Sequence, residues 1–288
     1  MDRVMTVNEK RVLIVYFSAA GSTRHIAEVM EKRFKELGLE SSLYEVADNR
    51  DLCQTISRQI LRLGNDCCLV VGSPVYVSHA APPIMQCISS LSSVDGSYAV
   101  PFVTWGGASS GISLFEMARE LSRKGFKILG AAKVLAVHSL MWQLENPLGA
   151  GHPNSEDDKV IEQLVDEISN KMQGGGGKEV ELSRLAYQSK EAHIEMEKVT
   201  LETAKAHMPT REVEEERCSQ CEICAEVCPT DSLTLVPYPV FGKECVYCFN
   251  CMKSCPEGAI KVDLTEVWQR IRDRAAFFKE QPQTQIFF

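Results

Sequence analysis

The apolar positions of the first 173 residues fall into short runs separated by segments of helical periodicity. The runs are typical of buried strands, and between them apolar residues recur every three or four positions, as on one face of a helix. Strands that alternate with helices build a parallel sheet covered by helices on both faces. We therefore expect an α/β domain with a doubly wound, five-stranded parallel sheet. The predicted strands are 12–17, 39–46, 68–72, 98–104 and 127–137, and the predicted helices are 23–37, 51–63, 82–91, 111–124 and 155–172.

The pattern changes at residues 174–177, where four consecutive glycines end the last of these helices. Residues 179–208 contain neither Pro nor Gly, and their apolar positions recur at helical intervals, so we expect one linker helix that Pro209 ends. A second amphipathic pattern precedes the C-terminal tail. The predicted units are 1–173, the glycine-rich hinge and linker helix 174–210, a cysteine-rich domain 211–263, and a helix with its tail 264–288.

Eight of the twelve cysteines form two runs of identical spacing, C-x2-C-x2-C-x3-C-P, with 27 positions between corresponding residues. Short spacings let one loop wrap three thiolates around an iron–sulfur cubane, which offers four iron corners. Zinc is the alternative, but zinc sites group their ligands as two pairs separated by a longer loop, and three close cysteines fit that poorly. The runs are Cys218, Cys221, Cys224 and Cys228 before Pro229, and Cys245, Cys248, Cys251 and Cys255 before Pro256.

Over residues 217–262 the sequence resembles the bacterial-type ferredoxins with two [4Fe–4S] clusters. The resemblance implies a small α+β domain that transfers electrons. It also implies cross-ligation, in which the first three cysteines of a run hold one cluster and the fourth ligates the other. The implied ligand sets are Cys218, Cys221, Cys224 and Cys255 for one cluster, and Cys245, Cys248, Cys251 and Cys228 for its neighbour.

The remaining four cysteines stand apart from these runs. Cys67 and Cys68 flank a strand start, and Cys53 and Cys87 lie on predicted helices. A small buried thiol is the ordinary state of such a residue, so we expect four free thiols.

A small, hydroxyl-rich turn follows the first predicted strand and leads into a helix. It contains Ser18, Ala20, Gly21, Ser22 and Thr23. Backbone N–H groups at a helix N-terminus converge on an anion, and Ser and Thr hydroxyls add donors, so the turn suits a phosphate. A simple helix cap would explain the same residues.

Two further loops follow the third and fourth predicted strands, and the carboxyl ends of parallel strands are where open α/β sheets bind ligands. Each loop places an aromatic residue beside small ones, as a flat isoalloxazine ring requires. We expect Tyr76 and Trp105 to stack on such a ring. The two loops comprise Ser73, Pro74, Val75 and Tyr76, and Thr104, Trp105, Gly106 and Gly107.

With all three loops, residues 1–173 resemble the flavodoxins, whose phosphate loop reads roughly S-x-T-G-x-T. Ser18, Gly21, Ser22 and Thr23 match that pattern, while Ala20 replaces the usual Thr and removes one hydroxyl. The resemblance implies FMN as the cofactor. NAD and ATP are poor alternatives because the sequence has no G-x-G-x-x-G after the first strand and no P-loop Lys.

The formal net charge of −8 opposes nucleic-acid binding and suits a basic docking partner. No apolar run approaches the ~20 residues of a membrane span, and the run 12–17 is too short for a signal peptide, so we expect no integral membrane contact and a cytoplasmic location. His79, His138 and His152 lie near the predicted ligand edge, where surface or packing roles are their ordinary explanation.

The order of the two units resembles the flavodoxin–ferredoxin fusion proteins of anaerobic microbes. The resemblance implies electron relay between two [4Fe–4S] clusters, FMN and an external redox protein or small redox acceptor. The alternatives are an FMN-dependent reductase of a quinone, disulfide or other small substrate, and a docking module without flavin. A linker helix of ~30 residues would extend about 45 Å, so we expect a homodimer that exchanges ferredoxin-like domains in preference to folding back within one chain.

Overall fold

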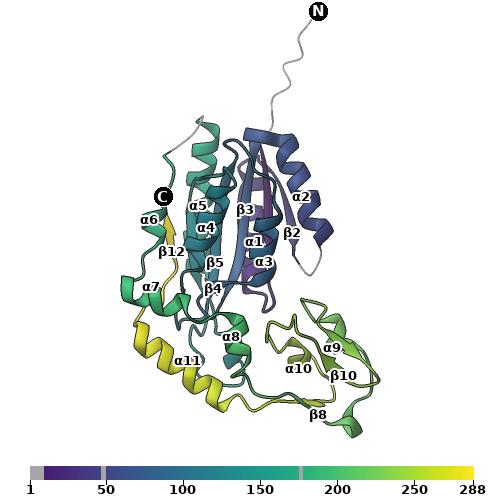
Figure 1. Cartoon of the computed structure of the whole chain (residues 1–288). Coiled ribbons are helices and arrows are strands. Elements are labelled where there is room, and N and C mark those ends of the chain that lie inside the picture. The colour runs from purple at the N-terminus through teal and green to yellow at the C-terminus, as the bar shows by residue number, and fades with distance from the viewer. Residues whose placement is uncertain (1–9, 47–49, 175–177) are drawn as a thin grey trace, which may run out of the picture.

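The computed structural model describes residues 10–46, 50–174 and 178–288 and contains a layered α/β domain (Figure 1). Five parallel strands run side by side in the order 2-1-3-4-5 of their succession along the chain, which is the flavodoxin-like order. The predicted fold class is confirmed. In spatial order these strands are β2 (Glu40–Glu45), β1 (Arg11–Tyr16), β3 (Cys67–Tyr76), β5 (Tyr98–Trp105) and β7 (Ala131–Leu135).

Helices cover both faces of this sheet, and each of the five was predicted to within two residues at either end. One apolar cluster joins two of the helices to one face of the sheet, and a second joins the other three to the opposite face. The first group is α1 (Ser22–Glu36) and α5 (Ser155–Gln173), and the second is α2 (Arg50–Leu63), α3 (Pro82–Ser90) and α4 (Ser113–Arg123).

Two strands differ from their predicted bounds by more than one residue. The predicted strand 127–137 divides into β6 (Lys127–Ile128) and β7. Gly130 lies between them, where an added Cβ would lie 2.9 Å from the Leu164 side chain. The third strand continues beyond Gly72 and pairs with β4 (His79–Ala80). A short 3₁₀ turn, Gly64–Asp66, precedes β3, and another, Ser139–Met141, follows β7.

The prediction of one linker helix is wrong. Residues 178–208 contain three short helices, α6 (Leu182–Leu185), α7 (Lys190–Glu197) and α8 (Leu201–Lys205). Ser189 and Thr200 each accept hydrogen bonds from the backbone of the helix that follows, so each begins a new helix where the periodic pattern predicted continuity. Of the predicted hinge, residues 175–177 lie outside the described residues.

The linker packs on the domain that precedes it. Val180, Leu185 and Leu201 belong to the apolar cluster on one face of the sheet. Burial of these side chains stabilises the three short helices against the first domain. The chain thus turns back across the α/β domain before it enters the cysteine-rich region (Figure 1).

The C-terminal segment also returns to the α/β domain. Helix α11 (Thr265–Phe278) confirms the predicted amphipathic helix, and β12 (Gln285–Phe287) adds an antiparallel strand beside β7. Phe287 is buried and its ring stacks on Tyr187, with the centroids 5.5 Å apart. The tail therefore docks on the α/β domain of its own chain.

A buried ion pair fixes the turn between α11 and β12. Glu280 Oε1 lies 2.7 Å from Lys133 Nζ, and Glu280 Oε2 accepts a 2.8 Å hydrogen bond from the Ser110 backbone N–H. Burial opposes the charged carboxylate, but Lys133 and Ser110 outweigh it and lower the pKa of Glu280. This pair attaches residues at the end of the chain to the centre of the first domain.

The cysteine-rich domain is small and made of short elements around its cysteines. It contains two short antiparallel strand pairs, β9 (Leu233–Leu235) with β10 (Pro239–Phe241) and β8 (Glu212–Val213) with β11 (Ile260–Lys261), and two helical turns. The helical turns are α9 (Ile223–Glu226) and α10 (Asn250–Lys253), and a 3₁₀ turn, Glu215–Arg217, precedes them. None of the helices in the described part of the chain has both the length and the apolarity to cross a membrane.

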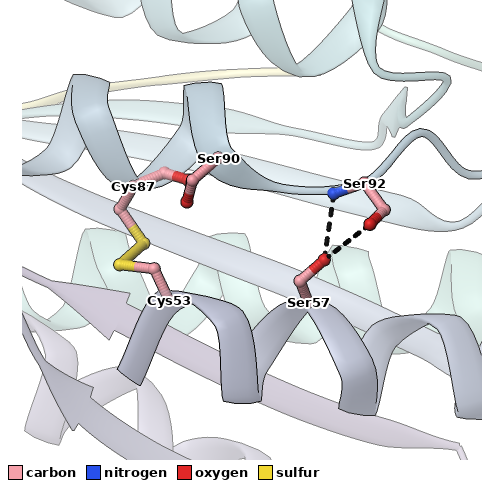
Figure 2. The surroundings of a disulfide bond; sticks show 5 residues. All are labelled: Cys53, Ser57, Cys87, Ser90 and Ser92. Carbon is pink, nitrogen blue, oxygen red and sulfur yellow. Dashed lines mark hydrogen bonds between the residues drawn. A yellow bond between two sulfur atoms is a disulfide. The ribbon is translucent and has the colours of Figure 1, made fainter. Parts of the chain in front are cut away.

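The expectation of four free cysteines outside the two runs is half wrong. Cys53 of α2 and Cys87 of α3 form a disulfide (Figure 2). The sequence could not show that these positions, 34 residues apart on separate helices, face each other. Cys67 and Cys68 are free and fully buried, as expected, and burial raises the pKa of Cys67 to about 12.

Candidate cofactor sites

The turn between β1 and α1 has the geometry of an anion site. Gly21 precedes α1 with φ of 90°, and the first turn of the helix contains no acidic residue. Ser18 Oγ accepts a 3.0 Å hydrogen bond from the Arg24 N–H, and Thr23 Oγ1 lies 2.8 Å from Thr104 Oγ1. The helix dipole and the N-terminal amides therefore point positive charge at the end of the sheet.

A cavity of about 390 Å³ adjoins this turn at the carboxyl edge of the sheet. Its volume is in the usual range for a small-molecule site. The structure brings nine of the thirteen predicted flavin-site residues to its wall. They are Ala20, Ser22, Thr23, Pro74, Val75, Tyr76, Thr104, Trp105 and Gly106.

The other four predicted residues shape the loops around the cavity. Ser18 and Gly21 form the anion turn described above. Ser73 Oγ accepts a 2.8 Å hydrogen bond from the Ala81 N–H and so holds the loop after β3. Gly107 has φ of 74°, which a residue with a side chain adopts only under strain.

The two predicted stacking residues differ in exposure. Tyr76 is half-buried, and burial raises the pKa of its hydroxyl. Trp105 is only 1% exposed, and Lys133 Nζ lies 5.5 Å from the centroid of its ring. That burial does not favour the stacking role of Trp105.

Much of the cavity wall comes from segments that sequence reasoning missed. Helix α11 contributes Arg270 and Arg274, the linker contributes His207, and the second cysteine run contributes Val246 and Tyr247. The apolar faces of the linker and of α11 indicated that both segments pack on something. They did not indicate that the partner would be the mouth of the sheet.

His138 lies at the same wall and stays uncharged near neutral pH. Burial lowers its pKa to about 4, and the charge of Lys253 acts in the same direction. The His138 ring also explains why position 106 is a glycine, since an added Cβ there would lie 2.7 Å from the ring. His79 and His152 instead pair with carboxylates, at 3.0 Å from Glu116 and 2.7 Å from Asp157.

The first predicted set of four cysteines surrounds one small cavity. It is lined by Cys218, Cys221, Cys224 and Cys255, together with residues of the loops between them. Cys255 comes from the second run, as cross-ligation requires. Four thiolates around one space are the donor set of a cubane, so these residues fit a [4Fe–4S] cluster.

The second predicted set is also brought together. Burial, followed by the charges of Cys245 and Cys228, raises the pKa of Cys248 to about 11. The Cys245 sulfur accepts a 3.0 Å hydrogen bond from Arg211 and the Cys228 sulfur a 3.3 Å bond from the Ser232 N–H. Such donors stabilise thiolate ligands and tune a cluster.

The backbone repeats the duplication of the sequence. Residues with positive φ recur at a spacing of 27: Gln220 and Tyr247, Glu222 and Phe249, and Asp231 and Gly258. Backbones of alternating hand gather N–H groups into anion-binding concavities, which suits an iron–sulfur cluster. Within the described residues, no three or more His, Cys, Asp or Glu side chains are grouped as for a single metal ion.

The second cysteine run contacts the predicted phosphate turn directly. Asn250, between Cys248 and Cys251, donates a 2.5 Å hydrogen bond to the Ala19 carbonyl, and Lys253 Nζ donates a 3.1 Å bond to the Ser139 carbonyl. Figure 1 shows this domain beside the end of the sheet where β3 turns into β4. The two candidate sites therefore meet at one junction.

Comparisons with known proteins found matches in two parts of the chain. The family model described as "4Fe-4S binding domain" matches residues 211–234. No curated protein matches the chain. With its 2-1-3-4-5 strand order, the chain combines a flavodoxin-like fold with a 4Fe–4S binding domain.

Several solved structures resemble the α/β part. A flavodoxin from the domain Archaea is 15% identical with a TM-score of 0.43, over 57% of this chain and 99% of that one. A flavodoxin of Streptococcus pneumonia TIGR4 is 17% identical with a TM-score of 0.43, over 56% and 98%. The rubredoxin oxygen:oxidoreductase from the anaerobe Desulfovibrio gigas is 19% identical with a TM-score of 0.42, over 57% of this chain and 36% of that one.

Proposed function

We propose that the protein is an iron–sulfur flavoprotein that relays electrons between two [4Fe–4S] clusters, FMN and an external redox partner. One observation carries the proposal. Val246 and Tyr247, which lie between the predicted ligands Cys245 and Cys248, line the same cavity as the predicted phosphate turn. A cluster held by the second run would therefore share a wall with the flavin.

Each part of the chain has a distinct task in this proposal. The N-terminus of α1 binds the FMN phosphate, and the loops after β3 and β5 hold the ring. The cofactors supply the redox chemistry, with one-electron exchange at the clusters and storage of two electrons on the flavin. The protein orients the groups, and the linker and α11 shield the flavin from water.

The exposure of the cysteines suggests an order of transfer. The first set has one exposed member, Cys221, and one buried member, Cys224. The second set has two buried members, Cys248 and Cys251, and none that is exposed. We assign the first-set cluster to exchange with the external partner and the second-set cluster to exchange with FMN.

The broken linker bears on whether transfer crosses between two chains. Domain exchange was expected because a straight helix would have carried the clusters about 45 Å away. With the linker folded back, Asn250 reaches Ala19 of its own chain, which supports transfer within one chain. Mixing a subunit without the cluster cysteines with one unable to bind FMN tests this. Fast flavin reduction in the mixed dimer would support domain exchange, and fast transfer in a strict monomer would exclude it.

Anaerobic purification followed by absorbance and metal analysis tests the cofactor content. We expect about eight iron, eight sulfide and one FMN per chain. Stoichiometric zinc without iron, or FAD in place of FMN, would overturn the assignment. Rapid mixing with dithionite then tests the relay, because Cys251→Ala should slow flavin reduction at least about tenfold while FMN remains bound.

An FMN-dependent reductase of a small acceptor is the second candidate. It is favoured by Arg270 and Arg274, which line the flavin cavity. Arg274 hydrogen-bonds to the Ser78 hydroxyl, whereas Arg270 Nη1 lies 4.0 Å from Glu266 Oε2. Turnover with anionic quinones or disulfides, lost in Arg274→Gln, would support a reductase. Unchanged oxidation rates in that variant would favour the relay.

A further inference from the structure

The disulfide between Cys53 and Cys87 has no part in the relay proposed above. It links α2 to α3, and each cysteine is only 5% exposed (Figure 2). Neither residue belongs to the two cysteine runs. The question is whether this bond is a fixed cross-link or a group that changes its redox state.

The disulfide borders a cleft between the two domains. Cys53 and Cys87 line a space of about 760 Å³, and Thr230, Glu244 and Val246 of the ferredoxin-like domain line it as well. Val246 stands between Cys245 and Cys248, the predicted ligands of the second-set cluster. Cys53, Cys87, Val246 and Cys248 also belong to one apolar cluster of buried residues. The disulfide thus lies in the part of the first domain that the ferredoxin-like domain contacts.

The same two segments have a second attachment that contains no sulfur. Ser57 Oγ and Ser92 Oγ lie 3.1 Å apart, and the Ser92 N–H donates a 2.9 Å hydrogen bond to Ser57 Oγ (Figure 2). Ile56, Ile84 and Ile88 are buried in the same apolar cluster. Breaking the disulfide would therefore leave α2 and α3 packed, so both redox states are compatible with one fold.

The redox compartment provides a further argument. Iron–sulfur clusters belong to reducing surroundings, where disulfides are rare and are usually transient, catalytic or redox-sensing. A cross-link needed only for stability is poorly suited to a chain that must keep eight other cysteines reduced. We propose that Cys53 and Cys87 form a redox-active dithiol–disulfide pair that accepts electrons from the ferredoxin-like domain. The identity of the donor rests on the proposed function.

The exchange balances in atoms and electrons. The disulfide accepts two electrons, one from each reduced [4Fe–4S] cluster, and two protons from the solvent in the cleft. The S–S bond breaks, two S–H bonds form, and both clusters return to their oxidised state.

A thiol titration tests the pair independently of the clusters. Purified full-length protein is equilibrated anaerobically in dithiothreitol buffers of graded ratio, quenched in acid, and alkylated for peptide mass spectrometry. We expect Cys53 and Cys87 to convert together and reversibly, with unchanged far-ultraviolet circular dichroism. Resistance to reduction, or loss of the fold on reduction, would show a structural cross-link and overturn the proposal.

Reduction by dithionite tests the donor in the holoprotein. Free Cys53 and Cys87 should appear at least about tenfold faster in the wild type than in Cys251→Ala, which lacks the proposed second-set cluster. Equal rates would overturn the electron path. Iron content and absorbance, recorded in the same samples, show whether the clusters themselves are present, so failure of the proposed function is recognised separately.

Ser57→Ala supplies a matched control, because it removes the other attachment between the same segments. It should lower thermal stability while leaving the ratio of dithiothreitol to its oxidised form at half-reduction unchanged within about twofold. A tenfold shift of that ratio would show that the disulfide reports helix packing, and would count against a dedicated redox pair.

Discussion

Different interactions stabilise the two domains of this protein. In the flavodoxin-like domain, the first seven residues of β3 are all buried, and apolar clusters fill both faces of the sheet. The cluster inside the ferredoxin-like domain has four buried members, Cys224, Leu233, Cys251 and Ile260, and two of them are predicted cluster ligands. The first domain can fold by burying apolar surface, whereas the second depends on what its cysteines bind.

Removing the clusters should have the largest effect, because it should unfold one domain and leave the other folded. Chelation of iron under mild oxidation should unfold residues 211–263 while leaving the sheet of the first domain intact, because ligation supplies folding free energy that the small core lacks. Hydrogen exchange measures this. Amides of α9 and α10 should lose protection about a thousandfold or more, while those of β1 and β3 keep theirs. Equal loss in both domains would contradict the contrast.

Cross-ligation refines that prediction. Cys228→Ala should damage the cluster of Cys245, Cys248 and Cys251, and Cys255→Ala should damage the cluster of the first run. Paramagnetic resonance of the two variants separates the signals. Damage confined to the cluster of the mutated run would show that each run ligates its own cluster.

Introducing negative charge at the phosphate turn should abolish flavin binding without unfolding the first domain. Ser22→Glu with Thr23→Glu places two carboxylates beside the FMN phosphate. Like charges a few Å apart repel by about 4 kcal/mol each at an effective dielectric constant near 20, so the Kd should rise a thousandfold or more. Fluorescence titration with FMN measures this. Ala20→Thr is the matched control, since its added hydroxyl should tighten binding by about fivefold.

Loss of the buried ion pair should destabilise the domain that has the large core. Glu280→Gln leaves the Lys133 ammonium buried beside Trp105 without its carboxylate, and breaking such a pair costs about 3 kcal/mol or more. Urea unfolding followed by tryptophan fluorescence measures the change. Adding Lys133→Met should restore most of the stability. If Glu280→Gln unfolds at the same urea concentration as the wild type, the Glu280–Lys133 pair contributes little to the stability of the first domain.

The smallest expected effect is a pH dependence at the junction. The pKa of His138 is about 4 in the folded protein and ordinary, near 6.5, in the unfolded chain. The unfolded chain therefore binds more protons between these values, and stability falls as pH drops from 6.5 towards 4. The loss at pH 5 should be about 1 to 2 kcal/mol. His138→Asn keeps an acceptor for the Leu140 N–H and should remove this dependence, which denaturation at pH 7 and pH 5 would reveal.

Periodicity predicted the sheet and its helices because those signals are local to each segment. It failed at the linker, where Ser189 and Thr200 cap new helices although the apolar periodicity continues through both positions. The fixed spacing of the cysteines predicted two sets of four ligands, and the structure places the first of these sets around one cavity. By contrast, the disulfide and the arginines Arg270 and Arg274 depend on which helices meet in space, and no single segment encodes that.

The position of β12 has a consequence for how the protein is made. β12 follows residues 211–263 in the chain and still pairs with β7 as the edge strand of the first sheet. During synthesis, the amino-terminal sheet therefore stays incomplete until the whole cysteine-rich segment has been translated. Until β12 has been synthesised, the backbone groups on the outer edge of β7 have no strand to pair with. Cluster assembly and closure of the sheet consequently fall in the same late interval of biogenesis, and a chain truncated before residue 285 should leave the ribosome with that edge still open.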